Sequence, residues 1–218
     1  MARDHWDLAR EKAKRQPKRR IIIYCEGKKT EPSYFRALER HYRNALIKVE
    51  TIQAGVPMTV AERAVARAIE EGLAKRSRRK PKNSFEEGDQ VWAAFDVDDH
   101  PRFDEAVALC VSTGVGVCRS NPCFEVWLIL HEQEFHSPAD RHGVCAHLER
   151  LRPEYDANGA KTCDFEEMVR RVEIAEERAR AQLQSREKER APFGRPSTTA
   201  GELTAAIREA STLHRPKR

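Results

Sequence analysis

Residues 91–100 of this 218-residue chain read Val91-Trp-Ala-Ala-Phe-Asp96-Val97-Asp98-Asp99-His100, and the rest of the chain is interpreted around them. An apolar run that ends in acids is typical of a buried strand that delivers carboxylates to its end. Side chains alternate across a strand, so Asp96 and Asp98 project the same way and can meet one divalent cation. The same acids, followed by Pro101, are also typical of a solvated turn. The stretch by itself leaves both interpretations open.

Strands and helices alternate on both sides of this stretch. Runs of β-branched and aromatic residues indicate strands, and apolar residues at helical spacing indicate the helices between them. The predicted strands cover residues 21–25, 45–54, 90–96 and 115–119, and helices are expected to start near residues 30, 59, 103 and 123. Four alternations with short links predict an α/β domain on a parallel sheet with helices on both faces.

Polar residues follow three of these strands, at Glu26, Asp96 and Ser120-Asn121. Right-handed crossovers place such turns along one edge of the sheet, where open α/β sheets bind their ligands. Three acids are expected there: Glu26, Asp96 and Asp98. Carboxylate oxygens suit Mg²⁺, which is typically held by one or two carboxylates plus a substrate phosphate.

Cationic and polar residues accompany these acids. Lys28, Lys29, Arg119 and Asn121 lie beside the same turns and are expected to bind the flanking phosphates of a nucleic acid. The chain has 40 Lys and Arg against 35 Asp and Glu, and the basic residues cluster in Arg10–Arg20 and Lys75–Lys82. Such clusters bind nucleic acid phosphates or are merely solvated segments, and both interpretations stay open.

The chain is expected to be cytoplasmic, with no membrane contact. It has no apolar run of about 18 residues, and its first twenty residues are charged rather than apolar. Its six cysteines include no Cys-x-x-Cys pair, so we expect reduced packing thiols. A zinc site built from His142, Cys145, His147 and Cys163 is conceivable, but the spacing matches no standard finger.

Three segments are expected along the chain. Residues 1–20 form a basic arm, residues 21–135 the α/β domain, and residues 136–218 a mainly helical C-terminal extension, within which 186–199 is interpreted as a loop or linker. The helices of the extension can pack on the domain, form an oligomer or dock a partner.

Three blocks of sequence carry a resemblance to known proteins. Glu26-Gly27 after a first strand and Asp96-x-Asp98 after a third resemble the signature of the Toprim fold, shared by topoisomerases, bacterial primases, OLD-type nucleases and RecR. More narrowly, Tyr24–Phe35, Phe95–Asp99 and Ser120–Trp127 with His131 resemble the RloB-like proteins. Those proteins occur in bacterial and archaeal defence loci, often near restriction systems or beside an ATPase partner.

The resemblance implies roles for particular residues. Glu26 matches a general acid or base that also approaches the metal, and Asp96 and Asp98 match the pair that binds Mg²⁺ or Mn²⁺. Asp99, Glu125 and His131 are accessory candidates without a derived role. The function implied is a metal-dependent nuclease that cleaves RNA, tRNA included, or DNA in anti-phage defence. The alternative is a non-catalytic Toprim module that binds nucleic acid or a partner and works with an ATPase.

Overall fold

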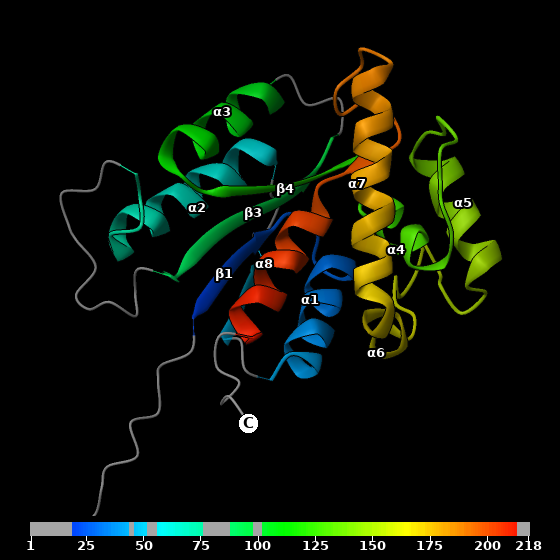
Figure 1. Ribbon diagram of the computed structural model, residues 1–218, viewed down its shortest axis with the longest axis horizontal. Coiled ribbons are helices and arrows are strands. Elements are labelled where there is room, and N and C mark those ends of the chain that lie inside the picture. The colour runs from blue at the N-terminus through cyan, green and yellow to red at the C-terminus, as the bar shows by residue number, and fades with distance from the viewer. Residues whose placement is uncertain (1–18, 44–45, 52–55, 76–87, 98–101, 213–218) are drawn as a thin grey trace, which may run out of the picture.

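The computed structural model describes residues 19–43, 46–51, 56–75, 88–97 and 102–212. Its centre is a five-stranded sheet with the order β2-β1-β3-β4-β5 (Figure 1). The first four strands are parallel, and the short β5 pairs antiparallel with β4. The strands are β1 (Arg20–Cys25), β2 (Leu46–Thr51), β3 (Gln90–Asp96), β4 (Gly116–Asn121) and β5 (Ser197–Thr198). The predicted α/β fold with a mainly parallel sheet is confirmed.

The strand β1 shows why a run of apolar residues without alternation indicates a central strand. Ile21, Ile23 and Cys25 enter the hydrophobic cluster on one face of the sheet, and Ile22 and Tyr24 enter the cluster on the other. None of these five side chains is more than 6% exposed. Both faces of the strand are therefore covered, as expected in a parallel sheet flanked by helices.

Helices cover both faces of the sheet (Figure 1). One face carries α2 (Pro57–Glu71) and α3 (Phe103–Thr113), and the other carries α1 (Thr30–His41), α4 (Glu125–Glu132), α7 (Val172–Lys188) and α8 (Ala200–Thr212). The helix α5 (Arg141–Leu151) packs against α4, and α6 (Phe165–Met168) leads through the 3₁₀ turn η2 (Val169–Arg171) into α7.

The C-terminal helices share a hydrophobic core with the sheet. Val144, Leu148, Val172 and Leu203 belong to the same buried cluster as Trp127. Side chains on both sides of the predicted boundary at residue 135 thus pack together. Burial of this shared apolar surface stabilises both parts at once.

The interpretation of residues 186–199 as a linker is wrong in part. Ser197 and Thr198 form β5, and the hydroxyl groups of Thr198 and Ser120 are hydrogen-bonded at 2.8 Å. Two residues are too few to show a strand periodicity in a sequence, so only the return of the chain to β4 creates this strand.

Parts of the predicted organisation fall outside the described residues. These are the arm at residues 1–18 and most of the basic cluster Lys75–Lys82. Among the helices that the structure does describe, none has the length and apolar character needed to cross a membrane.

Candidate active site

The turns after β1, β3 and β4 lie at the same edge of the sheet. The Glu26 amide donates to the Ala94 carbonyl at 3.0 Å, and the Val97 amide donates to the Ser120 carbonyl at 2.8 Å. Each strand end is therefore bonded to its neighbour. The sequence correctly predicted that Glu26, Asp96 and Ser120-Asn121 share the carboxyl edge, but Ser120 and Asn121 are the last residues of β4 and not a turn, because their pairing with β5 extends the strand.

A cavity of ≈ 310 Å³ opens at this edge. It contains three carboxylates, Glu31, Asp96 and Glu125, which come from α1, β3 and α4. Four cationic side chains surround them. The lining residues are Gly27, Lys28, Lys29, Thr30, Glu31, Asp96, Phe124, Glu125, Arg141, Asn158, Gly159 and Lys161.

The three carboxylates are shielded from water. Glu31 is 7% exposed and Glu125 is 4% exposed, while the Asp96 side chain is 14% exposed. Burial raises the pKa of Asp96 well above its usual range, and the charges of Glu31 and Glu125 raise it further. Burial likewise raises the pKa of Glu31, and Glu125 again adds to the effect. The cluster therefore favours protons or a cation.

Gly27 leaves the space that the Glu31 carboxylate occupies. A Cβ atom on Gly27 would lie 2.0 Å from Oε2 of Glu31, so only glycine leaves room for this carboxylate over the turn after β1. Glu31 was not among the acids predicted from the sequence to lie at this edge. The only local hint was that Glu31 is an acid in the first turn of a helix that follows Glu26-Gly27 closely. Acids are common at that position because they complement the helix dipole, so the hint was not specific.

Residues 155–161 close the cavity from the C-terminal side. The Tyr155 hydroxyl donates to Oε1 of Glu125 at 2.6 Å, and Lys29 Nζ donates to the Gly159 carbonyl at 2.7 Å. The Thr30 hydroxyl contacts the Tyr155 hydroxyl at 3.4 Å. Three of the cavity's side chains thus contact a segment that lies elsewhere in the sequence, which no local pattern predicts.

A family model described as RloB-like protein matches residues 21–207. The chain belongs to the RloB-like protein family. The matched range runs from β1 into α8, so it includes the sheet, the cavity and the helices beyond residue 135. No curated protein and no solved structure matched the chain.

In this RloB-like chain the predicted acids differ in their relation to the cavity. Asp96 lines it, and Glu125, expected only as an accessory residue, lines it too. Glu26 is partly buried and is not a lining residue, but its charge raises the pKa of Asp96. Asp98 and Asp99 lie outside the described residues, so their roles stay predictions.

The predicted phosphate-binding residues separate into two pairs. Lys28 and Lys29 are exposed and line the cavity. Arg119 instead lies over the ring of Phe193, with Cζ 3.0 Å from the ring centroid, and the Asn121 amide donates to the Phe193 carbonyl at 2.9 Å. The structure does not bring this second pair to the cavity, because the chain returns to β4 near Phe193. Their contact with phosphate stays a prediction.

His131 lies in the core. It is 1% exposed, with Nε2 3.0 Å from the Tyr34 hydroxyl and Nδ1 3.0 Å from the Trp127 carbonyl. Burial lowers the pKa of His131 to about 3, so the imidazole is neutral at physiological pH. It is absent from the cavity lining, and its contacts are those of a packed residue.

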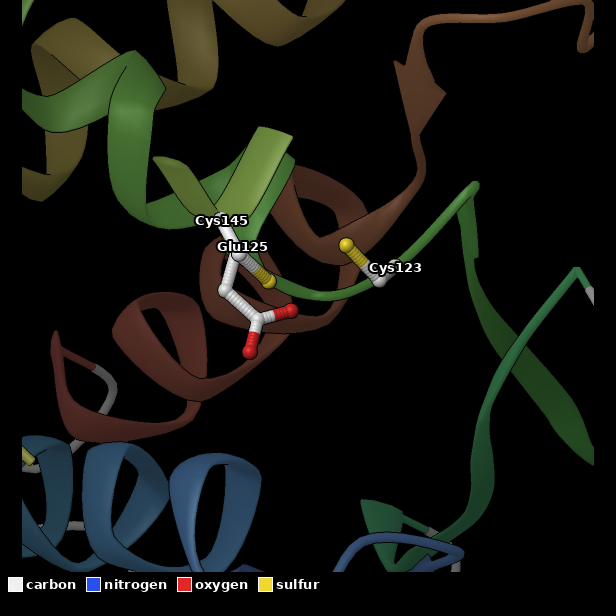
Figure 2. A group of neighbouring side chains, drawn as sticks. All are labelled: Cys123, Glu125 and Cys145. Carbon is white, nitrogen blue, oxygen red and sulfur yellow. The ribbon is translucent and has the colours of Figure 1, made fainter. Parts of the chain in front are cut away.

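Two cysteines approach Glu125 (Figure 2). Among the described residues, Cys123, Glu125 and Cys145 bring one ligand atom each within 4.8 Å of one another. The neighbours of Cys145 in this group differ from His142, His147 and Cys163, which the sequence had suggested. A hydrogen bond with Cys123 lowers the pKa of Cys145, and the same bond raises the pKa of Cys123.

Proposed function

We propose that this protein is a divalent-metal-dependent nuclease that hydrolyses phosphodiester bonds in RNA, tRNA included, or in DNA. The observation that carries the proposal is the convergence of Asp96, Glu31 and Glu125 in one cavity whose rim is basic. Buried acids that raise one another's proton affinity favour a bound cation, and a basic rim favours phosphate. A role as an effector of anti-phage defence rests on the resemblance to RloB-like proteins.

The donor set fits Mg²⁺ or Mn²⁺. Asp96, Glu31 and Glu125 offer hard oxygen ligands, although these oxygens are not gathered as closely as the atoms of the Cys123 group. Mg²⁺ keeps several waters and needs only one or two carboxylates plus a phosphate, so a full protein shell is not required. When bound, such an ion polarises a phosphoryl oxygen and lowers the pKa of water.

The chain's own residues supply the remaining functions. Lys28, Lys29 and Lys161 stand at the cavity and provide charge for the phosphates on either side of the scissile bond. Glu26, next to the acids of the cavity, is proposed to transfer a proton at the bridging oxygen. The Tyr155 hydroxyl, which also contacts the Thr30 hydroxyl, fixes the Glu125 carboxylate in the cavity.

Cleavage assays test this function. The purified chain, alone and with an ATPase partner from a defence locus, is incubated with RNA, tRNA and DNA panels in Mg²⁺ or Mn²⁺. We expect cleavage that requires the metal and is lost in Asp96→Asn. Loss of a general acid or base in Glu26→Gln should slow cleavage by about 10²–10⁴-fold. Panels that stay intact under all conditions would refute the proposal.

Asp89→Asn is the matched control. Asp89 stands just before β3 and Asp96 ends it, and each is ion-paired with an arginine, Arg20 at 3.1 Å and Arg141 at 2.8 Å. The control therefore removes a similarly buried, paired carboxylate far from the cavity. Cleavage should survive Asp89→Asn, and equal losses in both variants would argue against an active site at Asp96.

A non-catalytic binding module is the second candidate function. One observation favours it: the guanidinium of Arg141 already neutralises Asp96 at 2.8 Å. A protein cation at a carboxylate of the cavity is compatible with a site that binds nucleic acid without a metal. Salt-sensitive binding that persists in Asp96→Asn, without cleavage in any metal, would favour this function over the nuclease.

A further inference from the structure

The group formed by Cys123, Glu125 and Cys145 lies between the start of α4 and the helix α5. Cys123 lies between β4 and α4, Glu125 is the first residue of α4, and Cys145 lies on α5. In Figure 2 the two thiols point toward one another, with the Glu125 carboxylate beside them. One ligand atom from each residue lies within 4.8 Å of the other two.

This group shares Glu125 with the cavity, but its other two donors are thiols rather than carboxylates. Two thiols and a carboxylate form a soft, mixed ligand set, which suits Zn²⁺ and related transition metals and is poorly matched to Mg²⁺. Zinc binds sulfur at about 2.3 Å and carboxylate oxygen at about 2.0–2.2 Å. Ligand atoms around one zinc ion therefore lie roughly 3.5–4 Å apart. The group needs only a small contraction to reach that spacing.

The three residues are largely shielded from solvent, and a hydrogen bond orients the Glu125 carboxylate. Cys123 is 0% exposed and Glu125 is 4% exposed, while Cys145 is partly exposed and leaves a path to solvent. The Tyr155 hydroxyl donates to Oε1 of Glu125 at 2.6 Å. A hydrogen bond of this kind orients a ligating carboxylate, as outer-sphere partners do in metalloproteins.

We propose that Cys123, Glu125 and Cys145 bind a thiophilic divalent metal ion, Zn²⁺ in the first place. Three protein ligands leave a fourth position for water or another ligand. The ion ties α5 to the start of α4, and α5 also carries Arg141, which contacts Asp96. A metal ion bound by the thiols therefore fixes α5, the helix that places Arg141 at the cavity. The site does not depend on nuclease activity.

Cobalt titration tests the proposal directly. The full chain is purified in a phosphine reductant, stripped of metal and titrated with Co²⁺, whose thiolate complexes absorb in the near ultraviolet. We expect one equivalent of Co²⁺ per chain with a thiolate band, displaced by Zn²⁺. The band should be lost in Cys145→Ser and Cys123→Ser. A wild-type chain without a thiolate band would overturn the proposal.

Three further variants sharpen the test. Cys163→Ser removes another partly exposed cysteine outside the group and should leave the titration unchanged. Asp96→Asn should also keep the band, which separates this site from the proposed nuclease site. Tyr155→Phe should weaken Co²⁺ binding roughly 10–100-fold, because it removes the hydrogen bond to Glu125. Loss of the band in Cys163→Ser or Asp96→Asn would contradict the assignment.

A fold control accompanies the Cys145→Ser variant. Cys145 is partly exposed, so Cys145→Ser should unfold near the wild-type temperature in metal-free buffer. Zn²⁺ should raise the unfolding temperature of the wild type and leave that of Cys145→Ser unchanged. An equal rise in both proteins would place the metal elsewhere and overturn the proposal.

Discussion

The guanidinium of Arg141 lies 2.8 Å from the Asp96 carboxylate, so a helix outside the sheet places a cation at the end of β3. The two residues are 45 positions apart in the chain. Arg141 partly offsets the repulsion between Asp96 and the neighbouring acids. In the proposed nuclease, the same arginine competes with a divalent cation for Asp96.

Arg141→Gln should tighten Mn²⁺ binding. Removing a positive charge beside the carboxylates strengthens their attraction for a cation, and partial exposure of Arg141 limits the gain to about tenfold. Mn²⁺ titration followed by electron paramagnetic resonance measures the affinity. Arg150→Gln, an exposed arginine on the same helix, is the control and should match the wild type. Unchanged affinity in Arg141→Gln would show that this arginine does not compete with metal.

The free energy of unfolding of the metal-free protein should depend on pH through the protonation of Asp96. Its pKa is raised in the folded state, so the folded protein binds this proton more tightly than the unfolded chain. The stabilisation by the protonated Asp96 carboxyl is fully present below the unfolded pKa of about 4 and is lost as the pH rises through the folded pKa. Over that range the free energy of unfolding falls by at most about 1.4 kcal/mol per pH unit. Asp96→Asn should remove this slope.

Urea unfolding at a series of pH values in a metal chelator measures the effect. Neutral, buried His131 contributes a slope of the opposite sign, because its pKa is lowered in the folded state. The informative quantity is therefore the difference in unfolding free energy between wild type and Asp96→Asn. Parallel curves for the two proteins above pH 4 would contradict the raised pKa of Asp96.

Gly27→Ala should disturb the cavity more than the fold. The new Cβ would lie 2.0 Å from the Glu31 carboxylate, which is the far end of a flexible side chain and can be displaced. We expect a stability loss at the low end of the roughly 1–3 kcal/mol typical of overpacking, together with weaker Mn²⁺ binding.

Gly201→Ala is the control for this substitution. Its Cβ would come no closer than 3.4 Å to a neighbouring atom, which is ordinary van der Waals contact. Thermal unfolding and Mn²⁺ titration of both variants compare the two positions. Wild-type affinity for Mn²⁺ in Gly27→Ala would remove Glu31 from the proposed metal site.

The sequence predicted the features that depend on local pattern. β1 and β3 are buried on both faces, so their apolar runs stand out. Glu26, which follows β1, and Asp96, which ends β3, were correctly placed at one edge of the sheet. Parallel topology makes that placement a consequence of strand order alone.

The features that the sequence did not reveal depend on contacts between distant segments. Tyr155 meets Thr30 across 125 residues, and β5 forms only because Ser197 and Thr198 return to β4. The approach of Arg141 to Asp96 likewise depends on the packing of α5 near this edge. Hydrophobic periodicity contains no information on such pairings.

Tyr34→Phe should lower the stability of the fold, through His131, without affecting the cavity. The substitution removes the hydroxyl 3.0 Å from Nε2 and leaves a buried ring nitrogen without that partner, which costs about 1–3 kcal/mol of unfolding free energy. Metal binding and any cleavage should match the wild type below the unfolding temperature, because neither residue lines the cavity. Tyr42→Phe, at a half-buried tyrosine just after α1, should cost less. A Tyr34→Phe variant that keeps its stability but loses cleavage would assign His131 to the active site.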